Sequence, residues 1–167
     1  MKKTLVISSS LNPDSKGFKV CKMVAKSLQK KGLNVEILDI REYQLGHTFR
    51  PTEDMQKISE KIASADNFVI GMAVYCYSIN DSLKTLLDNC FEDVEGKKYG
   101  IVCAAGGDKS YLSTQHLTQI CANEWRMIQL PRVVYTSGKD WSDGELVSAD
   151  VAERVELFVN EFIDFVS

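Results

Sequence analysis

The sequence has few of the residues from which metal sites and disulfide frameworks are built. It holds two histidines, and its five cysteines include no Cys-x-x-Cys pair. The cysteine count is odd, and the cysteines are widely spaced. We therefore expect neither a metal site nor a disulfide framework. Most of the cysteines are interpreted as small apolar packing residues.

Long apolar runs and a strong charge of one sign are also missing. No stretch approaches the roughly 20 apolar residues that a membrane-spanning helix requires. The apolar run after Met1 is too short for a signal peptide. The net charge of −3, with a pI near 5.4, disfavours nucleic acid as a partner. We expect a soluble, cytoplasmic protein that binds neither membrane nor nucleic acid. The 167 residues predict a single domain, residues 1–167.

What the chain does contain is a regular alternation of strand-like and helix-like segments. Apolar runs predict strands at Leu5–Ile7, Val35–Ile40, Asn67–Val74, Tyr99–Ala105 and Arg132–Tyr135. Amphipathic patterns predict helices over Phe18–Lys31, after Thr52, over Leu83–Cys90, over Leu112–Arg126, and from Val151 through Phe165 to the end. Helical crossovers require parallel strands and right-handed connections. The pattern predicts an α/β, flavodoxin-like three-layer sandwich. Its five-stranded parallel sheet has the order 2-1-3-4-5, with helices on both faces.

The stretch Thr4–Gly17 joins the first strand to the first helix and is rich in serine. The first N–H groups of a helix have no internal partner, and the helix dipole makes this end electropositive. Small hydroxyl residues let the backbone approach an anion closely. We interpret Ser8 to Gly17 as a candidate phosphate cradle. A serine-rich turn that only caps the helix is the alternative.

Two further loops meet the first in the predicted sheet. Ligands of such sheets bind outside the carboxyl ends of the strands, at the switch point between strands 1 and 3. The loop Ala73–Ser82 carries Tyr75 and Tyr77, whose flat rings can pack on a planar ligand. The loop Ala105–Lys109 begins with a glycine pair that allows close backbone approach. Together the three loops suit the phosphorylated aromatic cofactor FMN. The tyrosines can also be core or interface residues, and Gly-Gly can be a simple turn.

These strings resemble those of the NAD(P)H-dependent FMN reductase family, which includes azo- and quinone-reducing members. The family's G-S-x-R-x-x-S corresponds to Ser9–Ser15. Its P-x-Y-x-x-S-x-P-x-x-L-K-x-x-L-D corresponds to Ala73–Asp88, with matches at Tyr75, Ser78, Leu83, Lys84, Leu87 and Asp88. A third motif, a small residue before Gly-Gly, falls on Ala105-Gly106-Gly107.

The chain departs from the family's motifs at four positions. Ser9 replaces a glycine, Asn12 an arginine, and Ala73 and Asn80 each a proline. Without the arginine a charge-assisted bond to phosphate is lost, for which Lys16 can compensate. Without the prolines we expect loops that are less restricted in φ.

The resemblance implies an FMN-dependent NAD(P)H oxidoreductase without a catalytic acid or base side chain. Hydride would pass from nicotinamide to flavin, and electrons then to a flavin, quinone, azo or similar small acceptor. The phosphate would lie at Ser10, Asn12, Ser15, Lys16 and Gly17. The ring would lie beside Ala73, Val74, Tyr75, Cys76, Tyr77 and Ser78, with its pyrimidine end at Ala105, Gly106 and Gly107. Within the ring loop, Cys76 is interpreted as a small filler rather than a redox group.

The third predicted helix carries apolar residues on more than one side: Leu83, Leu86, Leu87, Cys90 and Phe91. Such a helix needs a second surface to bury against, so we expect a homodimer or homotetramer. Two other functions stay open. One is a flavodoxin-type electron carrier, for which a net charge of −3 is modest. The other is a flavodoxin-fold binding module that has lost the flavin.

Overall fold

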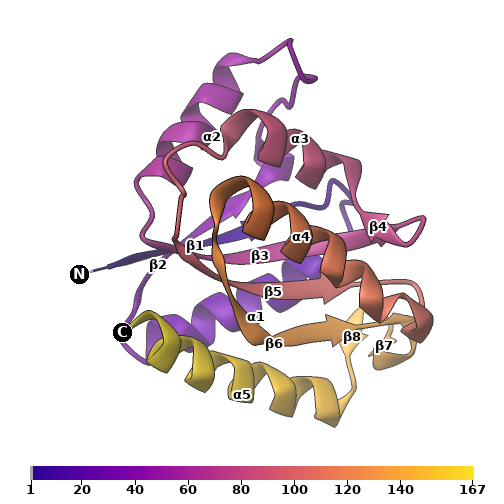
Figure 1. Ribbon diagram of the computed structural model, residues 1–167. Helices are drawn as coiled ribbons and strands as arrows, with labels where there is room; N and C mark the ends of the chain where they lie inside the picture. Colours follow the sequence, from indigo (N-terminus) through magenta and orange to yellow (C-terminus); the bar gives the residue numbers. More distant parts are fainter. Residues whose placement is uncertain (1) are drawn as a thin grey trace.

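The computed structural model describes residues 2–167, which form a central parallel sheet covered by helices on both faces (Figure 1). The five long strands are β1 (Lys3–Ser8), β2 (Asn34–Asp39), β3 (Asn67–Tyr75), β5 (Lys98–Ala104) and β6 (Ile128–Thr136). They pair in parallel in the order β2-β1-β3-β5-β6. Because β5 and β6 are the fourth and fifth long strands along the chain, the predicted order 2-1-3-4-5 is confirmed.

Two layers of helices bury the two faces of this sheet. Helices α1 (Lys16–Lys30) and α5 (Ala149–Val166) cover one face, and α2 (Glu53–Ala63), α3 (Asp81–Cys90) and α4 (Thr114–Trp125) cover the other (Figure 1). Alternate residues of β1 serve opposite layers. Leu5 and Ile7 pack with α2, α3 and α4, whereas Val6 packs with α1 and α5. Burial on both faces explains why the strands read as continuous apolar runs.

Side-chain hydroxyls begin three of the helices. The Oγ of Ser15 accepts the N–H of Phe18 at α1, Thr52 caps α2 in the same way, and Ser148 caps α5. Helix α1 stops at Gly32, whose φ of 92° lies in the left-handed region that glycine tolerates best. These signals lie in the sequence, so most helix boundaries follow the predictions closely.

The last long strand is longer than predicted. It runs over Ile128–Thr136 rather than Arg132–Tyr135 and includes Pro131. The register with β5 shifts between Tyr99 and Ile101, opposite this proline. Proline is tolerated here because β6 lies at the edge of the sheet, where an N–H is dispensable.

Helix α4 and the end of α5 also differ from the predictions. A 3₁₀ turn over Asp108–Ser113 precedes α4, which therefore begins at Thr114 rather than Leu112. At the end of α5, Phe165 is only partly buried, and Val166 next to it is buried instead.

Two short hairpins were not predicted. Strand β4 (Ser78–Ile79) folds back on the end of β3, and β7 (Trp141–Ser142) pairs with β8 (Glu145–Leu146). Strands of two residues carry no readable alternation in sequence.

Helix α3 corrects the reasoning behind the expected oligomer. Its apolar residues Leu83, Leu86, Leu87, Cys90 and Phe91 are all buried within this one chain, at exposures of 0 to 4%. They pack against β3, α2 and α4, so they do not by themselves require a second subunit.

The two ends of the described chain lie side by side at the amino-terminal edge of the sheet (Figure 1). The Nζ of Lys2 donates to the carbonyl of Val166 at 2.8 Å, and the Nζ of Lys98 donates to the carbonyl of Phe165 at 2.5 Å. Lysine side chains thus bind the last carbonyls of α5, which carry the negative end of its dipole. Of the helices in residues 2–167, none is both long and apolar enough to cross a membrane.

Candidate functional site

A pocket of about 270 Å³ opens at the carboxyl ends of β1, β3 and β5. It brings together most of the predicted site residues: Ser10, Asn12, Ser15, Lys16, Gly17, Ala73, Val74, Tyr75, Ala105 and Gly106. Cys76, Tyr77, Ser78 and Gly107 do not line it. The pocket also includes residues outside the predicted set: Ser8, Ser9, Asp14, Gly71, Met72 and Ala104. The three loops chosen from sequence therefore meet at one place.

The loop after β1 is shaped by its own polar groups. The Oδ1 of Asn12 accepts the N–H of Asp14 at 2.9 Å, and the carbonyl of Asn12 accepts the N–H of Ser15 at 3.1 Å. These bonds lead the chain into α1, whose first turn holds Lys16 and no acidic residue. The helix start and Lys16 favour an anion at this wall of the pocket. Asp14, which also lines the pocket, opposes them.

Ser8 has a buried hydroxyl without a partner. The residue is 1% exposed, lines the pocket, and its Oγ meets no hydrogen-bonding atom among residues 2–167. Leaving such a group unpaired costs about 1–3 kcal/mol, so a polar atom of a ligand would relieve it. The sequence predicts Ser8 as the start of the cradle, and the structure adds it as a residue that lines the pocket. Its place as the last residue of a buried strand is the signal that could have found it.

Gly106 has space beside it that no part of the chain fills. A Cβ built on Gly106 or on Gly107 meets no atom within 4 Å, and neither residue has a positive φ. By contrast, a Cβ on Gly71 would lie 2.5 Å from the Sγ of Cys21 and 2.8 Å from the carbonyl oxygen of Ile7. Packing therefore explains Gly71 but not Gly106 or Gly107. At Gly106, which lines the pocket, the lack of a side chain leaves room for a ligand.

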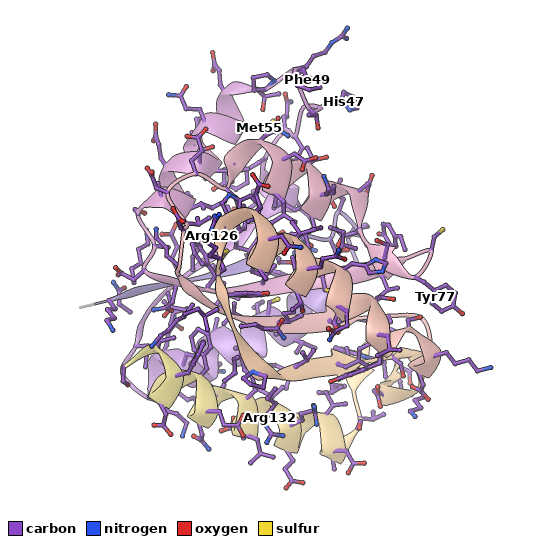
Figure 2. All side chains as sticks on the ribbon, viewed as in Figure 1. His47, Phe49, Met55, Tyr77, Arg126 and Arg132 are labelled. Carbon is purple, nitrogen blue, oxygen red and sulfur yellow. The ribbon has the colours of Figure 1, made fainter. Side chains whose placement is uncertain are left out.

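The far end of β3 forms a hairpin that stands beyond the pocket. Val74 pairs with Ile79 and Tyr75 with Ser78, while Cys76 and Tyr77 make the turn. Tyr77 is 64% exposed and projects from the tip of the hairpin (Figure 2). The predicted ring contacts Cys76, Tyr77 and Ser78 thus lie at or beyond the rim of the pocket rather than in its wall.

Contacts from β6 and α4 hold the outer loops. The hydroxyl of Tyr135 donates to the carbonyl of Gly107, and the N–H of Gly138 donates to the carbonyl of Gly106 at 3.2 Å. Partial burial raises the pKa of Tyr135, so this hydroxyl keeps its proton at neutral pH. On the other side, the Nδ1 of His116 lies 2.9 Å from the Oγ of Ser78. Neither Tyr135 nor His116 stood out in the sequence, because each acts across at least 28 residues.

Comparison with known proteins places this chain in a family. Residues 2–142 match the profile of the NADPH-dependent FMN reductases. An NAD(P)H-dependent FAD/FMN reductase of Geobacillus thermodenitrificans is 29% identical, over 88% of this chain and 86% of its own. A probable NADPH:quinone oxidoreductase 1 of Oryza sativa subsp. japonica is 32% identical, over 75% of this chain and 71% of its own.

A solved structure supports the fold. The apo form of an NADH:FMN oxidoreductase has a TM-score of 0.84 and 15% identity, covering 100% of this chain and 91% of its own. The resemblance found in the motifs is confirmed by the family profile. This chain belongs to the NADPH-dependent FMN reductase family and is an oxidoreductase with FMN as cofactor and NAD(P)H as reductant.

Proposed function

We propose that the pocket at the carboxyl ends of β1, β3 and β5 binds FMN, and that the protein passes electrons from NAD(P)H to a small acceptor. The observation that carries this proposal is the unfilled space beside Gly106, in the same pocket as the start of α1. The pocket's 270 Å³ lies just below the roughly 300–1,000 Å³ of typical ligand sites. The isoalloxazine ring would therefore extend out of the pocket, toward Tyr75 and the hairpin.

The chain's own residues would bind and orient the cofactor. Ser10, Asn12, Ser15, Lys16 and Gly17 would hold the phosphate with hydroxyl, amide, ammonium and helix-start N–H groups. Ser8 would pair its buried hydroxyl with a polar atom of the cofactor. When bound, FMN supplies the redox chemistry, and the protein supplies position and electrostatics. No side chain is required as an acid or base.

Exposed apolar side chains on and near the pocket loops support a flat, apolar acceptor. Tyr75 lines the pocket, and the others lie along the chain near the same loops: Leu11 after β1, Tyr77 in the hairpin, and Tyr111 and Leu112 in the 3₁₀ turn before α4. Aromatic rings of this kind cover a planar molecule well. We therefore propose a quinone, an azo compound or a second flavin as the acceptor.

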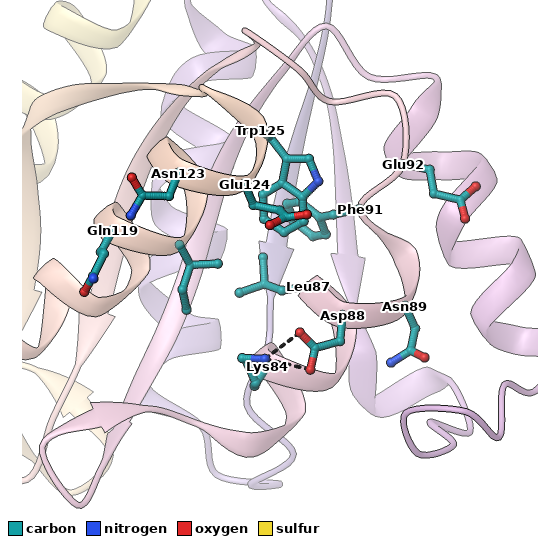
Figure 3. Close-up of a pocket in the computed structure, with 11 residues that line it drawn as sticks. Lys84, Leu87, Asp88, Asn89, Phe91, Glu92, Gln119, Asn123, Glu124 and Trp125 are labelled. Carbon is teal, nitrogen blue, oxygen red and sulfur yellow. Dashed lines mark hydrogen bonds and ion pairs between the residues drawn. The ribbon is translucent and has the colours of Figure 1, made fainter.

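We also propose that the protein is a homodimer or homotetramer. The ground is a groove on the surface rather than the apolar residues of α3. A groove of about 680 Å³ lies between α3 and α4 (Figure 3). Its apolar floor consists of the partly buried Ile120 and Trp125 beside the buried Leu87 and Phe91, and the Lys84–Asp88 pair stands at its rim. A second copy would cover this floor. A monomeric mass by light scattering at micromolar concentration would contradict the proposal.

A cytoplasmic location stays a prediction from the sequence.

The phosphate site can be tested with two substitutions whose new side chains have nearly the same size and shape. Ser15→Asp and Ser15→Asn both preserve a good N-cap for α1. Only Ser15→Asp adds a negative charge beside the phosphate, so FMN should bind at least about tenfold more weakly to it than to Ser15→Asn. Fluorescence titration with FMN measures both affinities. Equal FMN affinities of the two variants would show that the phosphate does not bind at this loop.

The catalytic part needs its own assay. The unmodified protein, supplied with FMN and a quinone, should oxidise NADH or NADPH continuously. An electron carrier would bind FMN without such turnover, and a module that has lost the flavin would not bind FMN at all. No turnover with either nicotinamide would contradict the reductase proposal while leaving the fold intact.

A further inference from the structure

Asn80 is completely buried and its side-chain amide is fully engaged. It stands at the N-cap of α3, but its side chain accepts no backbone N–H of that helix. Its Nδ2 donates to the carbonyl of Ser9 at 2.8 Å and to the Oγ of Ser82 at 2.7 Å. Its Oδ1 accepts the N–H of Ala73 at 3.0 Å and lies 3.2 Å from the Oγ of Ser9. The orientation of the amide is unambiguous, because Ala73 N–H can only donate and Ser9 C=O can only accept.

Neighbouring hydroxyls complete a closed set of bonds around Ser9. The Oγ of Ser82 donates to the carbonyl of Ser9 at 2.6 Å. The Oγ of Ser9 lies 2.6 Å from the carbonyl oxygen of Gly71, to which it donates. Ser9 and Ser82 are 1% and 5% exposed. Fully satisfied buried polar networks of this kind hold one arrangement strongly, because each lost bond leaves an unpaired group.

Asn80 connects β1 and β3 just beyond the point where their backbone pairing ends. The pairing of β1 with β3 ends at Ser8 and Gly71. Beyond it, the carbonyl of Ser9 and the N–H of Ala73 are bridged through the Asn80 amide. Ser9 lines the pocket from the loop after β1 and Ala73 from β3, whereas Asn80 does not line it. The amide therefore acts as one extra rung that fixes the distance between the phosphate loop and the ring side of the pocket.

We propose that Asn80 is a positioning residue for the cofactor, which it does not touch. It holds the loop after β1 against the end of β3, so FMN finds its phosphate wall and its ring wall already in register. The inference rests on the proposed FMN site. It predicts that changes at Asn80 alter cofactor affinity and the environment of the ring, beyond any loss of fold stability.

The chain offers a matched control in Asn67. This asparagine is 2% exposed and also joins β3 to β1, through a 2.6 Å bond from the Oγ1 of Thr4. It lies at the opposite end of the same strand pair, away from the pocket. A purely structural role for Asn80 would make the two asparagines equivalent.

The experiment compares Asn80→Asp and Asn80→Ser with Asn67→Asp and Asn67→Ser. Asp keeps the size of Asn but removes both donors, and Ser is also favoured at a helix N-cap but is too short to bridge the loops. We expect both changes at residue 80 to weaken FMN at least tenfold and to change the visible absorption of bound flavin. Changes at residue 67 should lower the melting temperature and leave flavin affinity and spectrum unchanged. Equal flavin affinities in the two pairs, at matched melting temperatures, would overturn the inference.

Hydrogen exchange separates this inference from the proposed function. The Ala73 amide should exchange at least tenfold faster in Asn80→Ser than in Asn67→Ser, with or without FMN. If the unmodified protein fails to bind FMN, the proposed function is wrong, while this exchange difference still supports the bridging role. If the Ala73 amide exchanges equally in both variants, the bridging role is wrong even in a protein that binds FMN.

Discussion

Tyr75 pairs with Ser78 across a turn of only two residues, and both turn residues have left-handed backbones. The φ angles are 49° for Cys76 and 60° for Tyr77. Such turns suit the twist of a hairpin but favour Asn-Gly, because a Cβ in this region costs about 1–2 kcal/mol. Strain of this kind is typically kept at functional sites. Here it lies at the rim of the proposed FMN pocket.

The strain should be measurable by relieving it. Tyr77→Gly removes the Cβ penalty and loses little packing, since Tyr77 is 64% exposed. We expect the free energy of unfolding to rise by about 1 kcal/mol in urea denaturation. Tyr77→Ala loses the same ring but keeps a Cβ at positive φ, so it should show no such gain. Equal stabilities for the two variants would mean that the turn carries no strain.

Substitutions of two glycines should distinguish an effect on FMN binding from an effect on core packing. Gly106→Ala should leave the melting temperature unchanged, because its Cβ meets nothing, yet weaken FMN several-fold by occupying the open space. Gly100→Ala places a Cβ 2.5 Å from the Cζ of Phe158 and should cost about 1–3 kcal/mol of stability. Its folded fraction should bind FMN normally. If Gly106→Ala binds FMN as tightly as the unmodified protein, the cofactor does not use that space.

The cysteines should differ sharply in reactivity. Burial raises the pKa of the Cys21, Cys103 and Cys121 thiols to about 12, and it also raises the pKa of Cys90. Cys76 alone among the five is exposed. A disulfide reagent at pH 8 should therefore modify one thiol in the native protein and five in urea. Cys76→Ser should abolish the native reaction, and a second reactive thiol would contradict the burial described here.

Glu36 should contribute stability that depends on pH. Its carboxylate lies 2.7 Å from the Nζ of Lys3 and also pairs with Lys61, and these lysines lower the pKa of Glu36. The stabilisation is therefore complete above the unfolded pKa of about 4.3 and is lost as the pH falls through the lower folded value. Glu36→Gln should cost about 1 kcal/mol at pH 7 and almost nothing near pH 2. Urea denaturation at both pH values checks this, and a difference that persists at pH 2 would assign the loss to packing.

The departures from the family's motifs should compensate one another. Ser9 and Ala73 bind the Asn80 amide through a carbonyl and an N–H, whereas the family pattern has glycine, proline and proline at these three positions. Asn80 has a φ of −67°, which proline can adopt. Asn80→Pro alone should weaken FMN by leaving the Ala73 N–H unpaired. Adding Ser9→Gly and Ala73→Pro should restore most of the affinity, and additive losses in the fluorescence titration would contradict this coupling.

The sheet order and the pocket could be predicted because they follow from local patterns. Continuous apolar runs marked the strands, and the order of strands then placed three loops together. The restraint on the loops could not be predicted in the same way. Asn80 restrains them through contacts to residues up to 71 positions away, which no local pattern shows. The hairpin of β3 and β4 was not predicted because its turn, Cys76-Tyr77, lacks the Asn-Gly signal. The extension of β6 was missed because Pro131 usually argues against a strand.

The contact between Lys2 and Val166 means that the segments of the chain could be connected in a different order. A short linker across that edge would join the two described ends, because they already lie side by side away from the pocket. New ends could then be opened near Phe49, which is 94% exposed in the loop before α2. Circular permutation succeeds at exposed loops of this kind. The protein could thus carry a sensor or a partner domain at a site chosen by the engineer, with the cofactor loops undisturbed.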